Sequence, residues 1–424
     1  MNNTLSLVLE QTAAAAVSLL LMGLCGIRLL LRLMRVLRGQ EAADGLGEGT
    51  AYAPLSALAA AAGIALLSRL MLYVLAYAMY RGFSIGSDSF AQSFLPLWMH
   101  WDTQHYVGIA QDGYVAMGDE RLRLVFFPLY PALMRLLAPL MGGNVFYSGV
   151  VVSLACASLS AALVYDLAYM HGGKTCAARA AAYYLLCPLS VFLCCVYTES
   201  LFICLTLLAV CLLRRGHAWL AALCGMLSAL TRMPGVIIAG LLIIALLEKI
   251  PKGTFTPRAV LSCVFQVLIV FSGLFLYWLI NWLVTGDPMT YLTYQRENWY
   301  QEPGSFWQST ANTMHYFLDT IGDGDWLYTW GFQLLCMLGI YLLLALRAQA
   351  LPFDLAAYSL VYVAVVLSPT WLLSAPRYLY ALCALPLMLA QLPLRRRGHG
   401  VMMGISAVWL AVWVFGYTIA VEVL

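Results

Sequence analysis

Charged side chains are scarce in this chain of 424 residues. Only 10% are Asp, Glu, Lys or Arg, whereas a soluble domain has about 25%, and 63% are hydrophobic. This composition excludes an ordinary soluble globular protein and predicts an all-α membrane protein that crosses the bilayer many times. The net charge of +3 provides no strongly basic surface, so we expect no nucleic-acid partner.

The cysteines form neither a zinc pattern nor a secreted disulfide framework. No two of the twelve are spaced C-x-x-C, and several lie inside apolar runs, where a thiol acts as a small apolar side chain. The first apolar run, near 12–34, continues into Arg35 and Arg38 without a cleavage site. We therefore expect it to be a membrane span and not a cleavable signal peptide.

A helix needs about 20 apolar residues to cross the hydrocarbon core. Twelve runs are candidates, several of them short: 12–34, 54–80, 145–170, 180–197, 199–213, 217–231, 235–248, 259–285, 327–346, 353–372, 377–394 and 401–422. No internal repeat or linker divides them. The sequence thus predicts about twelve transmembrane helices in a single domain, residues 1–424.

The direction of these spans follows from lysine and arginine, which favour cytoplasmic loops. With the N-terminus outside, the inner loops hold 15 of the 23 basic residues, at 28–38, 174–179, 214–215, 249–258, 347 and 395–397. The opposite orientation leaves only a few inside. We therefore predict both chain ends outside, with two large external loops at 81–144 and 286–326.

The segment "FFPLYPALMRLLAPLMG", 126–142, resembles a further span. Counting it as one would reverse every later helix and place the basic loops outside. It also contains three prolines and Arg135. We therefore predict a re-entrant or interfacial helix within the first external loop.

Ionisable side chains at membrane depth are costly and indicate function. Those that stand out are Arg69, within the second predicted span, and Asp102, His105, Glu199, Arg232 and Arg377, all on the predicted outer side. Three positions apart, Asp102 and His105 share a face if their stretch is helical. Trp98, Trp101 and Tyr106 would then lie at the headgroup level. The alternative is an interfacial helix with aromatic anchors and a solvated acid.

Each of the other candidates also has a plainer interpretation. His100, Asp102 and His105 form an H-x-D-x-x-H pattern, but histidines five apart align poorly on a helix and hard cations need more carboxylates. We therefore expect no metal. Glu199 is equally consistent with a charge in the first turn of a helix. Arg232 and Arg377 suit phosphate binding, or else snorkelling or an ion pair with Glu199 or Asp102.

Three segments together resemble the PIG-V family, the second mannosyltransferases of GPI-anchor synthesis and their prokaryotic relatives. They are "HWDTQHYVGIAQDGY" (100–114), "FFPLYP" (126–131) and "LCPLSVFLCCVYTESLF" (186–202), with "SR" at 68–69 and "PRYL" at 376–379 in support. The resemblance spans roughly 68–380. The residues after Arg232, Met233-Pro234-Gly235, depart from the small polar residues expected there.

The resemblance implies a GT-C fold, a membrane glycosyltransferase whose first large external loop carries the catalytic aspartate, here Asp102. It implies that the donor is a polyprenyl-phosphate-linked sugar, which in the family is mannose, and that no nucleotide sugar or cofactor is needed. We expect His105 to orient Asp102 or bind a sugar hydroxyl. Substrate contacts are expected from Trp101, Tyr106, Glu199, Arg232, Arg377 and Arg296.

These expectations describe an inverting transfer to a glycan or lipid-linked acceptor at the outer face of a membrane, the bacterial cytoplasmic membrane or, in a eukaryote, the endoplasmic reticulum. Two alternatives stay open. One is a transporter or flippase of a lipid-linked sugar, which would place polar residues near the bilayer midplane in paired halves. The other is a non-catalytic partner in a glycan-assembly complex.

Overall fold

Helices account for all the regular structure that the computed structural model describes, which covers residues 2–46, 50–83, 89–323 and 326–419. Six helical segments there are long and apolar enough to cross a membrane. They are α1 (Asn2–Leu37), α2 (Leu55–Gly82), α6 (Val145–Leu186), α10 (Pro257–Thr285), the π-helical turn η5 (Trp326–Gly331) continued by α13 (Phe332–Arg347), and α17 (Arg396–Thr418). The all-α membrane class is confirmed.

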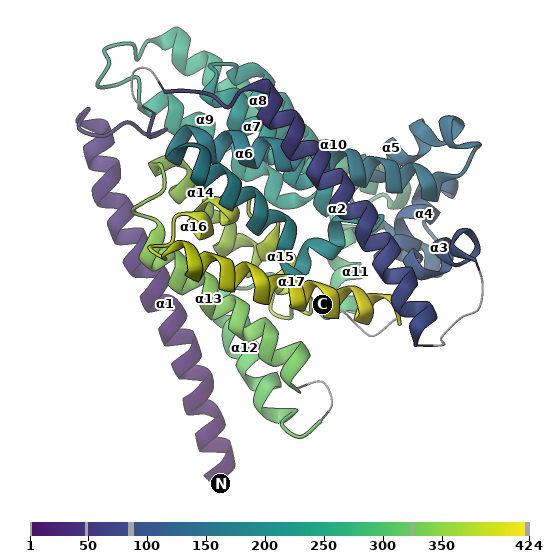
Figure 1. Ribbon diagram of the computed structural model, residues 1–424. Coiled ribbons are helices and arrows are strands. Elements are labelled where there is room, and N and C mark those ends of the chain that lie inside the picture. The colour runs from purple at the N-terminus through teal and green to yellow at the C-terminus, as the bar shows by residue number, and fades with distance from the viewer. Residues whose placement is uncertain (1, 47–49, 84–88, 324–325, 420–424) are drawn as a thin grey trace.

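Shorter helices fill the space between these long ones (Figure 1). Those between the spans are η3 (Pro188–Leu193), α7 (Glu199–Arg214), α8 (Ala218–Ala229), η4 (Met233–Ile237), α9 (Ile238–Leu247), α14 (Phe353–Val366), α15 (Ala375–Tyr380) and α16 (Leu385–Ala390). The predicted loop 81–144 holds α3 (Phe90–Trp98), α4 (Asp102–Asp112), η1 (Asp119–Val125), α5 (Leu129–Leu137) and η2 (Ala138–Met141). The predicted loop 286–326 holds α11 (Thr290–Trp299) and α12 (Phe306–Asp319).

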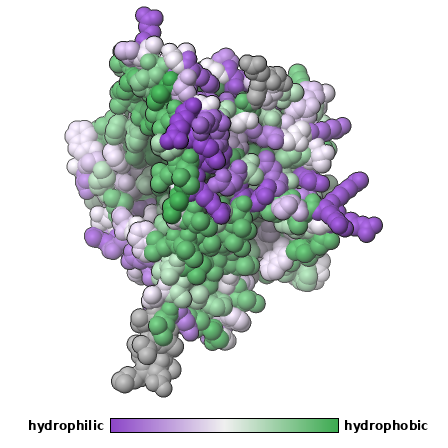
Figure 2. Space-filling view, turned by 90° about the vertical axis from the view of Figure 1, so that its left-hand side faces the viewer, coloured by the Kyte–Doolittle hydropathy of each residue, from purple (hydrophilic) through white to green (hydrophobic). Residues whose placement is uncertain are grey.

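The long helices present apolar side chains outward, as lipid contact requires. Leu20 and Leu30 of α1, Met71 of α2 and Leu283 of α10 are all more than 60% exposed. Figure 2 shows large continuous hydrophobic areas on one face, with hydrophilic side chains gathered in separate clusters. Such extensive apolar surface would be unstable in water and fits a bilayer.

Several predicted boundaries are wrong. The predicted inner loop 174–179 is helical, because α6 runs through it with a kink at Gly173. The predicted span 180–197 stops being α-helical at Leu186, shortly before Pro188. The predicted span 377–394 is divided into α15 and α16, each with a proline in its first turn. These segments are apolar because they lie in the protein core, where Val191 and Leu193 have no exposed surface.

The count of twelve spans stays a prediction, and the end of the last one, at 422, lies outside the described residues. The predicted re-entrant segment follows a sharp bend, because η1 and the helix Leu129–Met141 meet at 108°, as in a broken span or a re-entrant loop. That segment is consistent with the prediction.

The predicted inner loops and the candidate site residues lie at opposite ends of the molecule. Glu199 begins α7 and Arg214 ends it, which separates them by about 22 Å at 1.5 Å per residue. At the Arg214 end, Arg32 pairs with Glu41 and the backbone N–H of Ala43 donates to Glu248. Arg214 also pairs there with Asp354. The predicted inner loops 28–38, 214–215 and 249–258 thus meet at one end, as the topology requires.

Candidate functional site

The candidate base stands at the start of a short helix, after a strained turn. α4 begins at Asp102, and the preceding Trp101 has φ 45° and ψ −121°, a conformation that costs a residue with a side chain about 1–3 kcal/mol. The Trp101 ring packs edge-on against Tyr417 of α17 at 5.0 Å, and Tyr417 has no exposed surface. Packing against α17 therefore holds the turn that presents Asp102.

Asp102 belongs to a cluster of two carboxylates and two arginines. Arg377 Nη1 donates to Asp102 Oδ2 at 2.7 Å, although 275 positions separate the two residues in the chain. Arg377 Nε also lies 3.1 Å from Glu199 Oε1, an ion-pair distance at which the N–H makes no hydrogen bond. Arg232 Nη2 donates to the same Glu199 oxygen at 2.7 Å. The ion pair weighed from the sequence is therefore present, with formal charges that cancel.

The four members differ in depth. The Asp102 side chain is 25% exposed, whereas that of Glu199 has no exposed surface. The Arg377 side chain is 11% exposed. Glu199 thus lies below the arginines as their buried counter-ion, and Asp102 lies at the rim.

Local sequence explains how the two deeper residues are placed. Glu199 occupies the first turn of α7, where a carboxylate favours the helix dipole. Arg232 immediately precedes η4, which packs so closely on α8 that a Cβ at Gly235 would lie 2.3 Å from the backbone nitrogen of Ala229. The "MPG" departure after Arg232 therefore forms a turn that fixes this arginine beside Glu199.

Aromatic rings enclose the guanidinium of Arg377. Its central carbon lies 5.6 Å from the ring centre of Phe192, 5.2 Å from that of Tyr197 and 5.5 Å from that of Tyr378. Tyr378 also lies 5.2 Å from Arg232. Cation–π contacts of this kind are strongest where water is excluded, so the rings hold both arginines in position.

His105 lies on the same helix as Asp102 but has different neighbours. Its ring stacks on Phe126 at 4.6 Å, and Trp299 of α11 lies 6.5 Å away. Burial lowers the pKa of His105 below 6.5; Asp102 opposes this shift and Arg123 adds to it. The imidazole is therefore neutral at pH 7 and able both to donate and to accept a hydrogen bond.

Two of the rings expected at the headgroup level lie inside the protein instead. Trp98 is 1% exposed and stacks on Tyr417 at 5.1 Å. Tyr106 is 5% exposed and packs against Phe126 and Tyr130. Tyr106 is buried because α4 packs on α5 and α6, and Trp98 is buried because α3 packs on α2 and α17. Of the three rings, only Trp101 is partly exposed.

The remaining arginines lie apart from the cluster. Arg69 is buried and donates to the carbonyls of Leu185 and Ser190, so it caps the end of α6. Arg296 is exposed on α11, and no ion pair is found for it among the described residues. Asp112 is exposed at the end of α4 and pairs with Arg123 at 3.3 Å.

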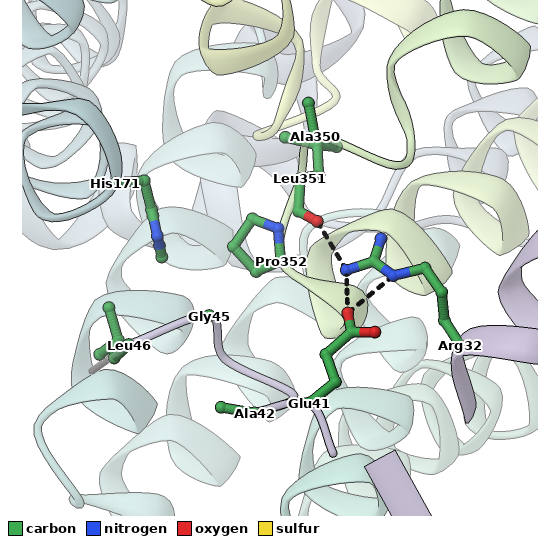
Figure 3. A pocket seen from close by; sticks show the side chains of 9 residues that line it. All are labelled: Arg32, Glu41, Ala42, Gly45, Leu46, His171, Ala350, Leu351 and Pro352. Atoms are coloured by element: carbon green, nitrogen blue, oxygen red, sulfur yellow. Dashed lines mark hydrogen bonds and ion pairs between the residues drawn. The ribbon is translucent and has the colours of Figure 1, made fainter. Parts of the chain in front are cut away.

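A cavity of about 430 Å³ lies at the opposite, basic end and not at this cluster. Figure 3 shows Arg32 beside it, bonded to Glu41 and to the carbonyl of Leu351, so these polar groups satisfy one another. Among the described residues, no three His, Cys, Asp or Glu side chains gather as metal ligands would. The expectation of a metal-free enzyme remains a prediction.

Sequence reasoning identified all four cluster residues separately but missed their supports. Tyr197 lies two positions before Glu199, and Tyr378 directly follows Arg377. Their positions in the quoted motifs could therefore have indicated that they belong to the site. No sequence feature indicated Trp299 and Tyr417, because their roles depend on contacts around α4 that only the fold creates.

Comparisons with known proteins agree with the motifs. The family model for mannosyltransferase (PIG-V) matches residues 65–298, which include Asp102, Glu199 and Arg232 but not Arg377. GPI alpha-1,6-mannosyltransferase 2 of Homo sapiens is 28% identical over 229 residues, 51% of this chain and 44% of that protein. The proteins of the same name from Cricetulus griseus and Rattus norvegicus are 31% and 32% identical, over 42% and 37% of this chain and 37% and 33% of their own lengths.

The matched region thus spans less than half the length of these curated relatives. No solved structure matches the chain. The family match covers more than half of the chain and contains the stretch that carries Asp102. The chain belongs to the mannosyltransferase (PIG-V) family.

Proposed function

We propose that the protein is a membrane mannosyltransferase that transfers mannose from a polyprenyl-phosphate donor to an acceptor hydroxyl. The observation that carries the proposal is the partly exposed carboxylate of Asp102, hydrogen-bonded to Arg377 at the rim of a buried Arg–Glu cluster. A base beside two cations suits a reaction in which a hydroxyl loses a proton and a phosphate gains charge. The names of the relatives supply mannose as the sugar.

The transfer is a single displacement. The acceptor oxygen attacks the anomeric carbon of the donor while Asp102 takes its proton. The bond from that carbon to the phosphate oxygen breaks, and its electron pair leaves with the polyprenyl phosphate. Attack from the face opposite the leaving group inverts the configuration at that carbon.

The arginines stabilise the leaving group. Arg232 uses Nη2 for Glu199, and its Nε and Nη1 have no partner among the described residues, so they are available to phosphate oxygens. Glu199 holds both arginines from below, which pre-organises the positive charge. We therefore assign Glu199 a positioning role in place of the direct substrate contact expected from the sequence, and keep Arg296 as a contact for the outer part of a substrate.

His105 and the rings beside it form the sugar side of the site. Neutral His105 offers one donor and one acceptor to sugar hydroxyls, and Phe126 and Trp299 offer apolar faces next to it. Because the two guanidinium groups supply positive charge, we expect the reaction to need no added metal. The site faces the external or lumenal side if the basic end faces the cytoplasm.

Donor turnover tests this proposal. The full chain, purified into lipid nanodiscs, is supplied with mannosyl, glucosyl or galactosyl polyprenyl phosphate and an extract of membrane lipids and glycans as acceptor. Consumption of the mannosyl donor, undiminished by EDTA, is the expected result. Failure to consume any donor, together with donor movement across sealed vesicles, would instead indicate the transporter.

A further inference from the structure

We propose that the donor phosphate takes over the Arg377 contact now made by Asp102, so that donor binding frees the base. This inference rests on the proposed function. It makes Arg377 the group that couples the donor site to Asp102. Donor binding then precedes removal of the acceptor proton.

The two carboxylates bound to Arg377 lie at different depths. Arg377 contacts one carboxylate with no exposed surface, Glu199, and one at the rim, Asp102. A ligand arriving from solvent reaches the Nη1 side of Arg377, where Asp102 is bound, before it can reach Glu199. The exchangeable partner is therefore Asp102.

The neighbours of Arg377 hold its guanidinium in place. Its guanidinium is enclosed by Phe192, Tyr197 and Tyr378 and lies 3.1 Å from Glu199. It can therefore change its outer partner without leaving its place. Only the side chain of Asp102 has to turn away, and that side chain is partly exposed.

The net charge of the cluster also favours an exchange of partners. The cluster is neutral with two arginines and two carboxylates, so a phosphodiester adds one negative charge without a new cation. Arg377 Nη1 cannot serve both the phosphate and Asp102 Oδ2 fully. Arg377 now occupies Asp102 Oδ2, and the exchange therefore frees that oxygen for the acceptor hydroxyl only when the donor is in place.

The consequence is that Asp102 and the donor compete. Asp102→Ala should bind the donor more tightly than the wild type, by at least about fivefold, the lower end of couplings between linked sites. A base that acts on the acceptor alone would leave donor affinity unchanged. Binding is measured directly with mannosyl polyprenyl phosphate, without acceptor, on the full chain in nanodiscs.

Two controls separate the exchange from a general loss of negative charge. Asp112→Ala removes an acid from the same helix, one that pairs with Arg123 and not with the cluster, and should leave donor affinity unchanged. In an Arg377→Ala background, Asp102→Ala should no longer tighten binding, because the shared partner is gone. Should Arg377→Ala not fold, Arg377→Lys replaces it, with the tightening reduced.

The outcomes are distinct. Tighter binding in Asp102→Ala that disappears without Arg377 supports the exchange. Unchanged affinity in Asp102→Ala, or equal tightening in Asp112→Ala, overturns it while the proposed function stands. Failure of the wild type to bind the mannosyl donor at all overturns the proposed function and the exchange with it.

Discussion

At the scale of single residues, the cluster shows why a few charges are kept in so apolar a chain. Arg232, Arg377 and Glu199 are almost completely enclosed, yet each has a partner of opposite charge within about 3 Å. Removing one partner from such a group leaves a buried charge uncompensated, which is costly. Variants must therefore be judged by turnover and by stability together.

Arg232→Ala should lower turnover by about two orders of magnitude, the loss typical of one donor to a developing anion. Arg232→Lys should recover part of it, because lysine keeps the charge but loses the planar fork. Turnover per folded protein is the measurement, with exposed Arg135 on α5 as the matched control. Normal turnover in Arg232→Ala would transfer the phosphate contact to Arg377 or Arg296.

The pKa of His105 predicts a pH effect on stability. Burial lowers it below the unfolded value of 6.5, so at pH values below 6.5 the unfolded chain binds more protons than the folded one. Stability therefore falls as pH falls through 6.5, and the loss is complete below the folded pKa. His105→Asn should weaken this dependence.

The measurement is the unfolding temperature in detergent between about pH 7.5 and pH 5.5, the range in which histidines titrate. His100, whose pKa burial also lowers, is present in both proteins and cancels in the comparison. Exposed His217 provides the control substitution, His217→Asn. A slope in His105→Asn equal to that of the wild type would contradict the assigned environment.

At the scale of elements, the long spans could be predicted and the broken ones could not. The runs 12–34, 54–80 and 259–285 correspond to α1, α2 and α10, because an exposed span must be apolar along most of its length. The same criterion also predicts spans at 180–197 and 377–394. Their apolarity instead reflects burial within the protein, so length and hydropathy alone misplaced their ends.

The site was predictable residue by residue but not as an assembly. Asp102, Glu199, Arg232 and Arg377 stood out because each is a costly charge next to an apolar run. Their partnership could not be read from the sequence, since it depends on how η3, η4 and α15 pack around the start of α7. The burial of Trp98 and Tyr106 could not be predicted either, since it depends on how α3 and α4 pack against helices distant in the sequence.

The contact between α17 and the start of α4 gives an element-scale prediction. Tyr417 packs against Trp98 and Trp101, and its hydroxyl is buried without a hydrogen-bond partner. Tyr417→Phe should therefore keep stability and turnover. Tyr417→Ala should cost about 3 kcal/mol or more of stability, as aromatic-to-Ala changes in cores do, and should lower turnover by releasing the Trp101 turn.

Thermal unfolding and donor turnover of both variants check this prediction. The Phe variant is the control, since it differs from the wild type only by the hydroxyl. Wild-type turnover in a folded Tyr417→Ala protein would show that α17 does not position Asp102.

At the scale of the whole molecule, the separation of the basic end from the cluster implies an orientation. The inner loops gather at the Arg214 end, and Asp102 lies at the other. Cysteines placed at 215 and 396 should be shielded from an impermeant thiol reagent added outside, whereas one at the exposed position 111 should react. Native cysteines are buried or half-buried, and the unmodified chain gives their background. Labelling of a cysteine at 215 or 396 from outside would contradict the predicted orientation.

The central claim, that Asp102 is the base of a mannosyl transfer, is tested most directly by the turnover of Asp102→Asn against Asp112→Asn. Both changes remove one carboxylate charge from α4 and keep the side-chain shape. The account predicts a loss of about two to four orders of magnitude for Asp102→Asn, and a change within about twofold for the exposed Asp112. Equal, small losses in the two variants would contradict it.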